Sequence, residues 1–142
     1  IQRDFETNLP RVRVMRDQLV QVFLNLILNS MDATEEGGIV RIETKRKNHL
    51  VEISIYDDGH GIEAAHREKI FQPYFTTKAT GTGLGLFVCR NIVEQQLGGS
   101  LRLSDSSPAG TTFLVTLALE EMSGTLPSGT DTPKTAAEVG TC

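Results

Sequence analysis

The sequence predicts an α/β fold, a two-layer sandwich in which a mixed sheet of about five strands carries three helices on one face. Short segments of alternating polar and apolar residues indicate strands, and longer segments with apolar residues three or four apart indicate helices. Turns that are polar or contain glycine or proline separate most of these segments. The resulting order, β-α-ββ-α-α-ββ, is typical of one sheet covered by one layer of helices.

The first half of the chain is predicted to form a strand, a long helix and a hairpin. Arginine and valine alternate in the strand, and Asp17 is a candidate N-cap of the helix. Gly37 and Gly38 end that helix, and a polar turn joins the hairpin strands. The expected ranges are 11–14 for the strand, about 18–34 for the helix, and about 39–46 and 50–56 for the hairpin.

The second half is predicted to form two helices and a second pair of strands. The longer helix has apolar residues at helical spacing and ends at a glycine C-cap, Gly98 and Gly99. Residues 72–82 form a loop between the helices, and a turn at 107–110 joins the strands. The expected ranges are 64–70 and 84 to about 97 for the helices, and about 100–105 and 111–119 for the strands.

Composition predicts one soluble domain. The 142 residues are a usual length for a single domain, and a net charge of −4 argues against a nucleic-acid surface. No apolar run reaches the roughly 20 residues of a membrane-spanning helix, so no direct membrane contact is expected. Two cysteines make no disulfide framework, which favours a reducing, cytoplasmic location. We expect the domain over 1–120 and a disordered tail over 121–142, within a longer parent that could be membrane-anchored.

Four polar residues form a stripe on the otherwise apolar helix at 18–34. Gln21, Asn25, Asn29 and Asp32 lie three or four apart and therefore share one face. Burying an unpaired amide costs about 1–3 kcal/mol, so inward-facing amides should have partners. The amide oxygen of Asn29 suits Mg²⁺, and Asn25 would polarise a metal-bound water or a phosphate. Taken alone, the stripe could equally face solvent on an ordinary amphipathic helix.

A glycine-containing segment directly follows the strand at 50–56. Asp57 can accept a hydrogen bond from the exocyclic amine of adenine, whereas guanine would present a second acceptor and repel it. Gly59 and Gly61 permit a sharp turn and a close approach to a ligand. The segment predicts an adenine site that prefers ATP to GTP. A plain turn with a capping aspartate is the alternative.

A second glycine-rich segment, residues 81–86, opens the helix at 84–97. Its free N–H groups and the positive end of the helix dipole would face a phosphate. It lacks the lysine of a Walker loop and follows a loop rather than a strand, which excludes a dinucleotide fingerprint. A flexible glycine loop is the alternative for this segment alone.

The loop between the two glycine-rich segments is predicted to be a lid. Tyr74 and Phe75 provide a hydrophobic anchor at one end, and Gly81 provides a hinge at the other. Lys78 is the cation of this loop that could reach the terminal phosphate. An ordinary exposed lysine is the alternative.

Together these segments resemble the ATP-binding catalytic domain of sensor histidine kinases, within the superfamily of gyrase, heat-shock chaperone and mismatch-repair ATPases. The resemblance covers residues 9–119. It implies a Bergerat-type sandwich that holds ATP and Mg²⁺ under a mobile lid, and Phe75-Thr76-Thr77-Lys78 is similar to the nitrogen-regulation and dicarboxylate-sensing branch. The matching motifs are Asn25 to Asn29 (N box), Asp57 to Gly61 (first glycine box), Phe71 to Phe75 (F box) and Gly81 to Leu86 (second glycine box).

The resemblance also implies roles for individual residues. Asp57 would contact adenine, Asn29 would hold Mg²⁺, and Thr111 or Thr112 would approach the adenine from the last strand. The residues implied to line the base are Ile62 and Leu86. The implied catalytic residues are Asn25, Asn29 and Lys78. The implied nucleotide-binding residues are Asn25, Asn29, Asp32, Ala33, Asp57, Gly59, Gly61, Ile62, Thr77, Lys78, Gly81, Thr82, Gly83, Leu84, Gly85, Leu86, Thr111 and Thr112.

Three features depart from the family's pattern. Asp32 stands where many members have a basic residue three positions after the magnesium-binding Asn, so the phosphates need another cation, for which Lys78 is the candidate. Asp58 replaces a frequent Asn and is expected to face solvent. The lid between Lys78 and Gly81 is short.

The predicted function is transfer of the γ-phosphoryl group of ATP to a histidine on a separate helical hairpin, with a response regulator downstream in two-component signalling. The 142 residues contain no such hairpin, and His49, His60 and His66 are not expected to be acceptors. A self-sufficient ATPase is the alternative, but Asn25 stands where the superfamily's ATPases have a glutamate base. A third hypothesis, a nucleotide-binding remnant that only docks to partners, is disfavoured by the intact motifs.

Overall fold

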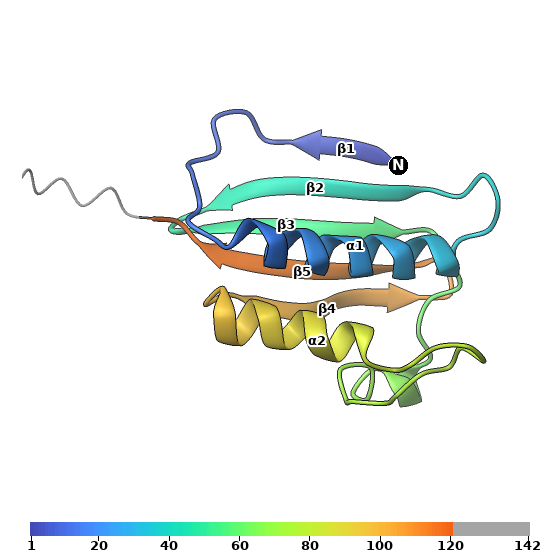
Figure 1. Ribbon diagram of the computed structural model, residues 1–142. Coiled ribbons are helices and arrows are strands. Elements are labelled where there is room, and N and C mark those ends of the chain that lie inside the picture. The colour runs from blue at the N-terminus through green and yellow to red at the C-terminus, as the bar shows by residue number, and fades with distance from the viewer. Residues whose placement is uncertain (121–142) are drawn as a thin grey trace, which may run out of the picture.

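A five-stranded mixed sheet forms one layer of the molecule and two α-helices form the other, as the computed structural model shows for residues 1–120, which it describes (Figure 1). The strand order is β1-β2-β3-β5-β4. The pair β1 and β2 is parallel and the other neighbouring pairs are antiparallel. The strands are β1 (Gln2–Phe5), β2 (Val40–Lys47), β3 (Leu50–Asp57), β4 (Ser100–Ser107) and β5 (Gly110–Ala118); the helices are α1 (Arg16–Ala33) and α2 (Gly85–Asn91).

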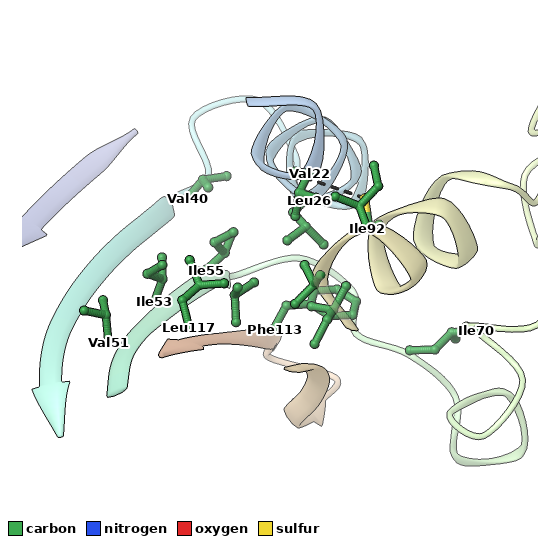
Figure 2. Close-up of a cluster of buried hydrophobic side chains, with 14 residues drawn as sticks. Val22, Leu26, Val40, Val51, Ile53, Ile55, Ile70, Ile92, Phe113 and Leu117 are labelled. Carbon is green, nitrogen blue, oxygen red and sulfur yellow. Dashed lines mark hydrogen bonds between the residues drawn. The ribbon is translucent and has the colours of Figure 1, made fainter. Parts of the chain in front are cut away.

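The core lies between the sheet and the two helices (Figure 2). Val22 and Leu26 of α1 are four residues apart and fully buried, because they fall on the face that packs against β3. On β3 every second residue is buried, and the residues of β5 that oppose them are buried as well. This alternation confirms that one face of the sheet carries the helices.

The N-terminal strand was predicted at the wrong place. Residues 11–14 form no regular element, and the strand that completes the sheet is β1, which pairs with β2 at the edge. Val12 and Val14 are partly buried against the core, whereas the arginines that alternate with them are exposed. This burial on one side explains why arginine and valine alternate in a segment that is not a strand. All four residues of β1 are exposed, which is why no apolar pattern marks this edge strand.

The predicted helix boundaries need three corrections. Helix α1 begins at Arg16, so Asp17 lies in the first turn and not at the N-cap, which is Met15. There its charge still interacts favourably with the helix dipole. The segment at 64–70 forms only a short 3₁₀ turn at Ala64–His66, so two α-helices, not three, cover the sheet within residues 1–120. Of 64–70, only Ile70 is buried, so this segment has no apolar face to hold a longer helix.

The C-terminal end of the second helix agrees with its prediction. Helix α2 continues into a wider π-type segment, Ile92–Gln96, in which Leu97 N donates to Ile92 O at 3.0 Å. Gly98 then adopts a φ of 63°, and Gly99 N donates to Val93 O at 2.9 Å. The left-handed glycine ends the helix as a C-cap.

Neither α-helix within residues 1–120 is long and apolar enough to cross a membrane. The tail predicted at 121–142 lies outside the described residues.

Candidate nucleotide-binding site

Asp57 is the last residue of β3 and is almost completely buried, with 2% of its surface exposed. Its Oδ1 atom accepts a hydrogen bond from Gly59 N at 3.0 Å. Burial raises the pKa of this carboxyl above 3.8, and the Gly59 amide, the Ser30 hydroxyl and the charge of His60 partly oppose that rise. A buried acceptor therefore stands at the end of a central strand, beside the helical layer.

Strand register separates the two threonines that the sequence left as alternatives. Thr111 lies directly opposite Asp57 in the antiparallel ladder, and Thr112 lies opposite Tyr56. Because opposed residues share a face, Thr111 is on the helix-covered side with Asp57 and Thr112 is on the other side. Thr111 is 4% exposed and lies 3.3 Å from Ser106, hydroxyl to hydroxyl.

Ser30 is a further candidate site residue, which the motifs in the sequence do not include. It is 1% exposed, and its Oγ atom has no direct hydrogen-bond partner among the described residues. It nevertheless lies close enough to Asp57 to lower the pKa of that carboxyl. The available signal was its place in the buried i, i+4, i+8 series with Val22 and Leu26, where a polar residue is unexpected.

The first glycine-rich segment packs against the last turn of α1. His60 N donates to Ala33 O at 3.2 Å, and a Cβ atom on Gly59 would collide with the Ala33 backbone. Glycine at 59 is therefore required by this close approach. Asp58 is exposed, as expected, and its Oδ1 accepts a hydrogen bond from Ile39 N at 2.7 Å.

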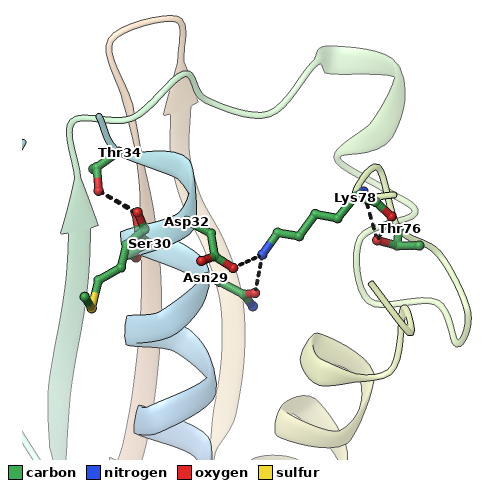
Figure 3. A network of polar contacts seen from close by, with 7 residues as sticks. Asn29, Ser30, Asp32, Thr34, Thr76 and Lys78 are labelled. Carbon is green, nitrogen blue, oxygen red and sulfur yellow. Dashed lines mark hydrogen bonds and ion pairs between the residues drawn. The ribbon is translucent and has the colours of Figure 1, made fainter. Parts of the chain in front are cut away.

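A polar network joins the lid to α1 (Figure 3). The ammonium group of Lys78 lies 2.6 Å from Asp32 Oδ2 and 3.2 Å from Asn29 Oδ1. Both oxygen atoms belong to one turn of α1 and converge on a single cation. Asn25, one turn earlier, lies beside the Cys89 thiol and lowers its pKa, although burial raises that pKa more strongly.

The lid and the second glycine-rich segment are organised by short-range hydrogen bonds. Within the lid, Lys78 N donates to Thr76 Oγ1 at 3.1 Å, and Gly81 N donates to Lys78 O at 3.2 Å. Leu84 N donates to Thr82 Oγ1 at 3.4 Å just before α2 begins at Gly85. Thr77 is exposed, and Leu86 packs at the margin of the core, as Ile62 does.

Aromatic residues fix the base of the lid to the core. The guanidinium carbon of Arg90 on α2 lies 4.9 Å from the centre of the Phe71 ring, and Phe71 also meets Phe113 edge-on. The rings of Phe75 and His66 have centres 5.3 Å apart. Of the two residues predicted to anchor the loop, Phe75 packs against the core, whereas Tyr74 is 76% exposed.

The structure thus brings several of the predicted residues to the C-terminal half of α1. Asp57, Gly59 and Thr111 lie on its inner side, and Lys78 reaches it from the lid. A hollow of about 280 Å³ elsewhere on the surface, beside Ile1 and the turn after α1, includes none of the predicted ligands.

An α/β sandwich with these motifs in this order defines a class of nucleotide-binding domains. The family described as "Histidine kinase-, DNA gyrase B-, and HSP90-like ATPase" matches residues 15–121, and the chain belongs to this family. Within it, the chain is a catalytic, ATP-binding domain of the sensor histidine kinase type, as the following similarities show.

Sensor histidine kinase ZraS of Escherichia coli (strain K12) is 44% identical over 119 residues, which cover 82% of this chain and 25% of ZraS. The chain therefore spans about a quarter of that relative's length. The nucleotide-free catalytic domain of histidine kinase ThkA has a TM-score of 0.72 at 36% identity, with 82% of this chain and 78% of that chain covered. A crystal structure of ThkA with the response regulator protein TrrA has a TM-score of 0.65 at 32% identity, with 82% and 33% covered. The predicted fold and the predicted family are both confirmed.

Proposed function

We propose that this domain binds ATP together with Mg²⁺ and donates the γ-phosphoryl group to a histidine on a separate domain. The observation that carries the proposal is the position of one turn of α1, residues 29–33. Its inner side meets the Asp57 segment and its outer side meets the lid through Lys78. A nucleotide laid along this turn would have its base near Asp57 and its phosphates near Asn29.

The base end of this turn supports adenine recognition. The buried carboxylate of Asp57 is an acceptor for the exocyclic amine, and the hydroxyls of Ser30 and Thr111 lie beside it on the same side of the sheet. The buried Ser30 hydroxyl has no direct hydrogen-bond partner among the described residues, and a bound base would supply one. Ile62 and Leu86 supply apolar surface for the ring.

The other end of the turn supports a magnesium site. Asn29 Oδ1 and Asp32 Oδ2 already accept hydrogen bonds from one ammonium group, so an amide and a carboxylate oxygen are placed to face a cation. Oxygen ligands of this kind fit Mg²⁺, and Asn29 is the residue that would hold it. When bound, Mg²⁺ would neutralise negative charge on the phosphate oxygens.

The second glycine-rich segment and the lid would bind the phosphates. Residues 81–86 lead into α2, and the backbone N–H groups of its first turn lack intrahelical partners. Asp32 stands where the family frequently has a basic residue, and it cannot supply positive charge. Lys78 supplies that charge instead. These groups would position and neutralise the phosphates, which is most of what phosphoryl transfer requires.

The transfer step needs no general base from this domain. An imidazole nitrogen of the acceptor forms a bond to the γ-phosphorus while the bond from that phosphorus to the β,γ-bridging oxygen breaks, and ADP leaves. Asn25 occupies the position at which a water-activating glutamate would stand, and an amide cannot take up a proton at neutral pH. We therefore favour phosphotransfer over hydrolysis.

The partners follow from this role. The acceptor histidine would lie on a helical hairpin of the parent protein, and a response regulator would receive the phosphoryl group next. The ThkA complex with TrrA supports a regulator as partner, because it pairs a similar kinase with one. We place the domain in the cytoplasm, a reducing compartment that suits its free Cys89 thiol.

Phosphorus NMR tests this proposal with the chain itself. In the presence of Mg²⁺, the ATP resonances should shift or broaden yet stay intact for hours, and phosphohistidine should appear only when the parent's hairpin is added. Steady release of inorganic phosphate by the chain alone would favour the ATPase hypothesis instead. ATP resonances that the chain leaves unperturbed would contradict nucleotide binding altogether.

A further inference from the structure

The side chain of Lys78 crosses from the lid to α1 and ends between two oxygen atoms of that helix. Its partner Asp32 is 46 residues away in sequence, so the contact depends on how the loop folds back onto α1. The side chains of Lys78 and Asp32 are 46% and 60% exposed. The ion pair is thus accessible to solvent and to any ligand that enters the site.

The contact holds more than one side chain in place. Lys78 N donates to Thr76 Oγ1, and Lys78 O accepts from Gly81 N, so the lysine lies at the centre of the lid's own hydrogen bonds. Phe75 and His66 fix the base of the lid on one side. Attaching Lys78 to α1 therefore attaches the turn at 76–81 as a unit.

Lys78 also occupies a position that the nucleotide needs. Its ammonium lies against Asn29 Oδ1, the proposed metal ligand, and two cations at one amide oxygen repel each other. A half-exposed ion pair changes an equilibrium by only about two- to fivefold. A triphosphate, with several negative charges, can therefore draw Lys78 away from Asp32.

We propose that Asp32 is a positioning residue that holds Lys78, and with it the lid, over the metal and phosphate subsite while no nucleotide is bound. When the nucleotide binds, Lys78 leaves Asp32 and turns to the terminal phosphate. This inference rests on the proposed function. Asp32 cannot neutralise the phosphates itself. In this proposal it holds Lys78 near the site, and Lys78 neutralises the phosphates after the nucleotide binds.

Hydrogen exchange of the lid, followed by mass spectrometry, tests the proposal. The variants are Asp32→Asn, Lys78→Gln and the double variant. Without nucleotide, each single variant should exchange the amides of 77–82 about two to five times faster than the unmodified chain. The double variant should be no faster than either single variant, because all three lose the same contact. With saturating Mg-ATP, Asp32→Asn should exchange like the unmodified chain.

A matched control is available in the β2–β3 hairpin. Glu52 pairs with Lys47 at 3.3 Å, so Glu52→Gln removes one negative charge, as Asp32→Asn does, and breaks a partly exposed ion pair outside the lid. It should leave exchange of the lid unchanged. Lid exchange that rises equally in this control would show a general charge effect and overturn the proposal.

Three other results would also overturn it. They are unchanged lid exchange in nucleotide-free Asp32→Asn, additive effects in the double variant, and an Asp32→Asn effect that persists with Mg-ATP bound.

Calorimetric titration with ATP, with and without Mg²⁺, adds a separate measurement. If Asp32 is instead a metal ligand, Asp32→Asn should weaken ATP binding only when Mg²⁺ is present, and that result would also overturn the proposal. If the unmodified chain did not bind ATP, the proposed function would be refuted. The lid exchange measured without nucleotide tests the Asp32–Lys78 contact independently of ATP binding.

Discussion

Asp57 and Thr111 are directly opposed residues of neighbouring antiparallel strands, and both side chains are buried on the face that the helices cover. Their separation is therefore set by the ladder itself and not by a flexible loop. The proposed base-recognition groups therefore stand on two paired strands of the sheet. Lys78, in contrast, stands on the loop that we propose to be the lid.

Replacing Asp57 by asparagine should weaken ATP binding by about 1–3 kcal/mol, the usual scale for losing a hydrogen bond to a buried charged acceptor. The preference for ATP over GTP should narrow as well, because the amide can donate to the guanine carbonyl. Calorimetric titration with both nucleotides measures this. Asp58→Asn is the control, since its side chain is exposed and the amide oxygen can still accept from Ile39 N. Unaltered ATP affinity in Asp57→Asn would refute the base assignment.

The buried carboxyl of Asp57 should also give folding stability a specific pH dependence. Burial raises its pKa above 3.8 in the folded state, so between 3.8 and the raised pKa the folded chain binds more protons than the unfolded chain. The free energy of unfolding therefore falls as pH rises through that window, and below 3.8 the penalty is absent. Asp57→Asn lacks this titration and should gain stability relative to the unmodified chain as pH rises. Urea unfolding of both proteins from about pH 3.5 to pH 7 tests this, and parallel curves would contradict it.

Asn29→Ala should remove the magnesium-dependent part of ATP binding. The variant loses the amide oxygen proposed to hold the ion, while Asp57 and the glycine-rich segment are untouched. The ratio of ATP affinities with Mg²⁺ and with a chelator should therefore fall toward about 1, and affinity in the chelator should change little. Fluorescence competition with a labelled nucleotide gives both affinities. A ratio equal to that of the unmodified chain would show that Asn29 is not the metal ligand.

Gly83 and Gly85 lie two residues apart where the loop enters α2, and they should respond oppositely to replacement by alanine. Gly83 has a φ of 70°, and a Cβ atom there would collide with the Tyr74 backbone, so Gly83→Ala should destabilise the domain by about 1–3 kcal/mol. Gly85 has open space and begins α2, so Gly85→Ala should stabilise it by about 0.5–1 kcal/mol. Chemical denaturation compares the two. Equal tolerance of both changes would mean that the backbone at Gly83 is not constrained in this way.

Local patterns were sufficient for much of the fold. The hairpin of β2 and β3 was predicted to within one residue at each end, because alternation and a polar turn are properties of adjacent residues. The C-cap at Gly98 was predicted for the same reason. Residues 11–14 carry the same alternation without forming a strand, because a strand needs a partner and the edge beside β2 is taken by β1.

The proposed site divides in a similar way. The sequence by itself determined which chemical groups are present and in what order: an amide stripe on a helix, an aspartate before glycines, and a glycine-rich entrance to a second helix. These are local, so spacing alone reveals them. Only the tertiary structure decided that Thr111 and not Thr112 shares a face with Asp57, that Ser30 is buried beside it, and that Lys78 meets Asp32. Those relationships depend on strand register and on contacts between distant segments, which are fixed by packing of the whole domain and not by neighbouring residues.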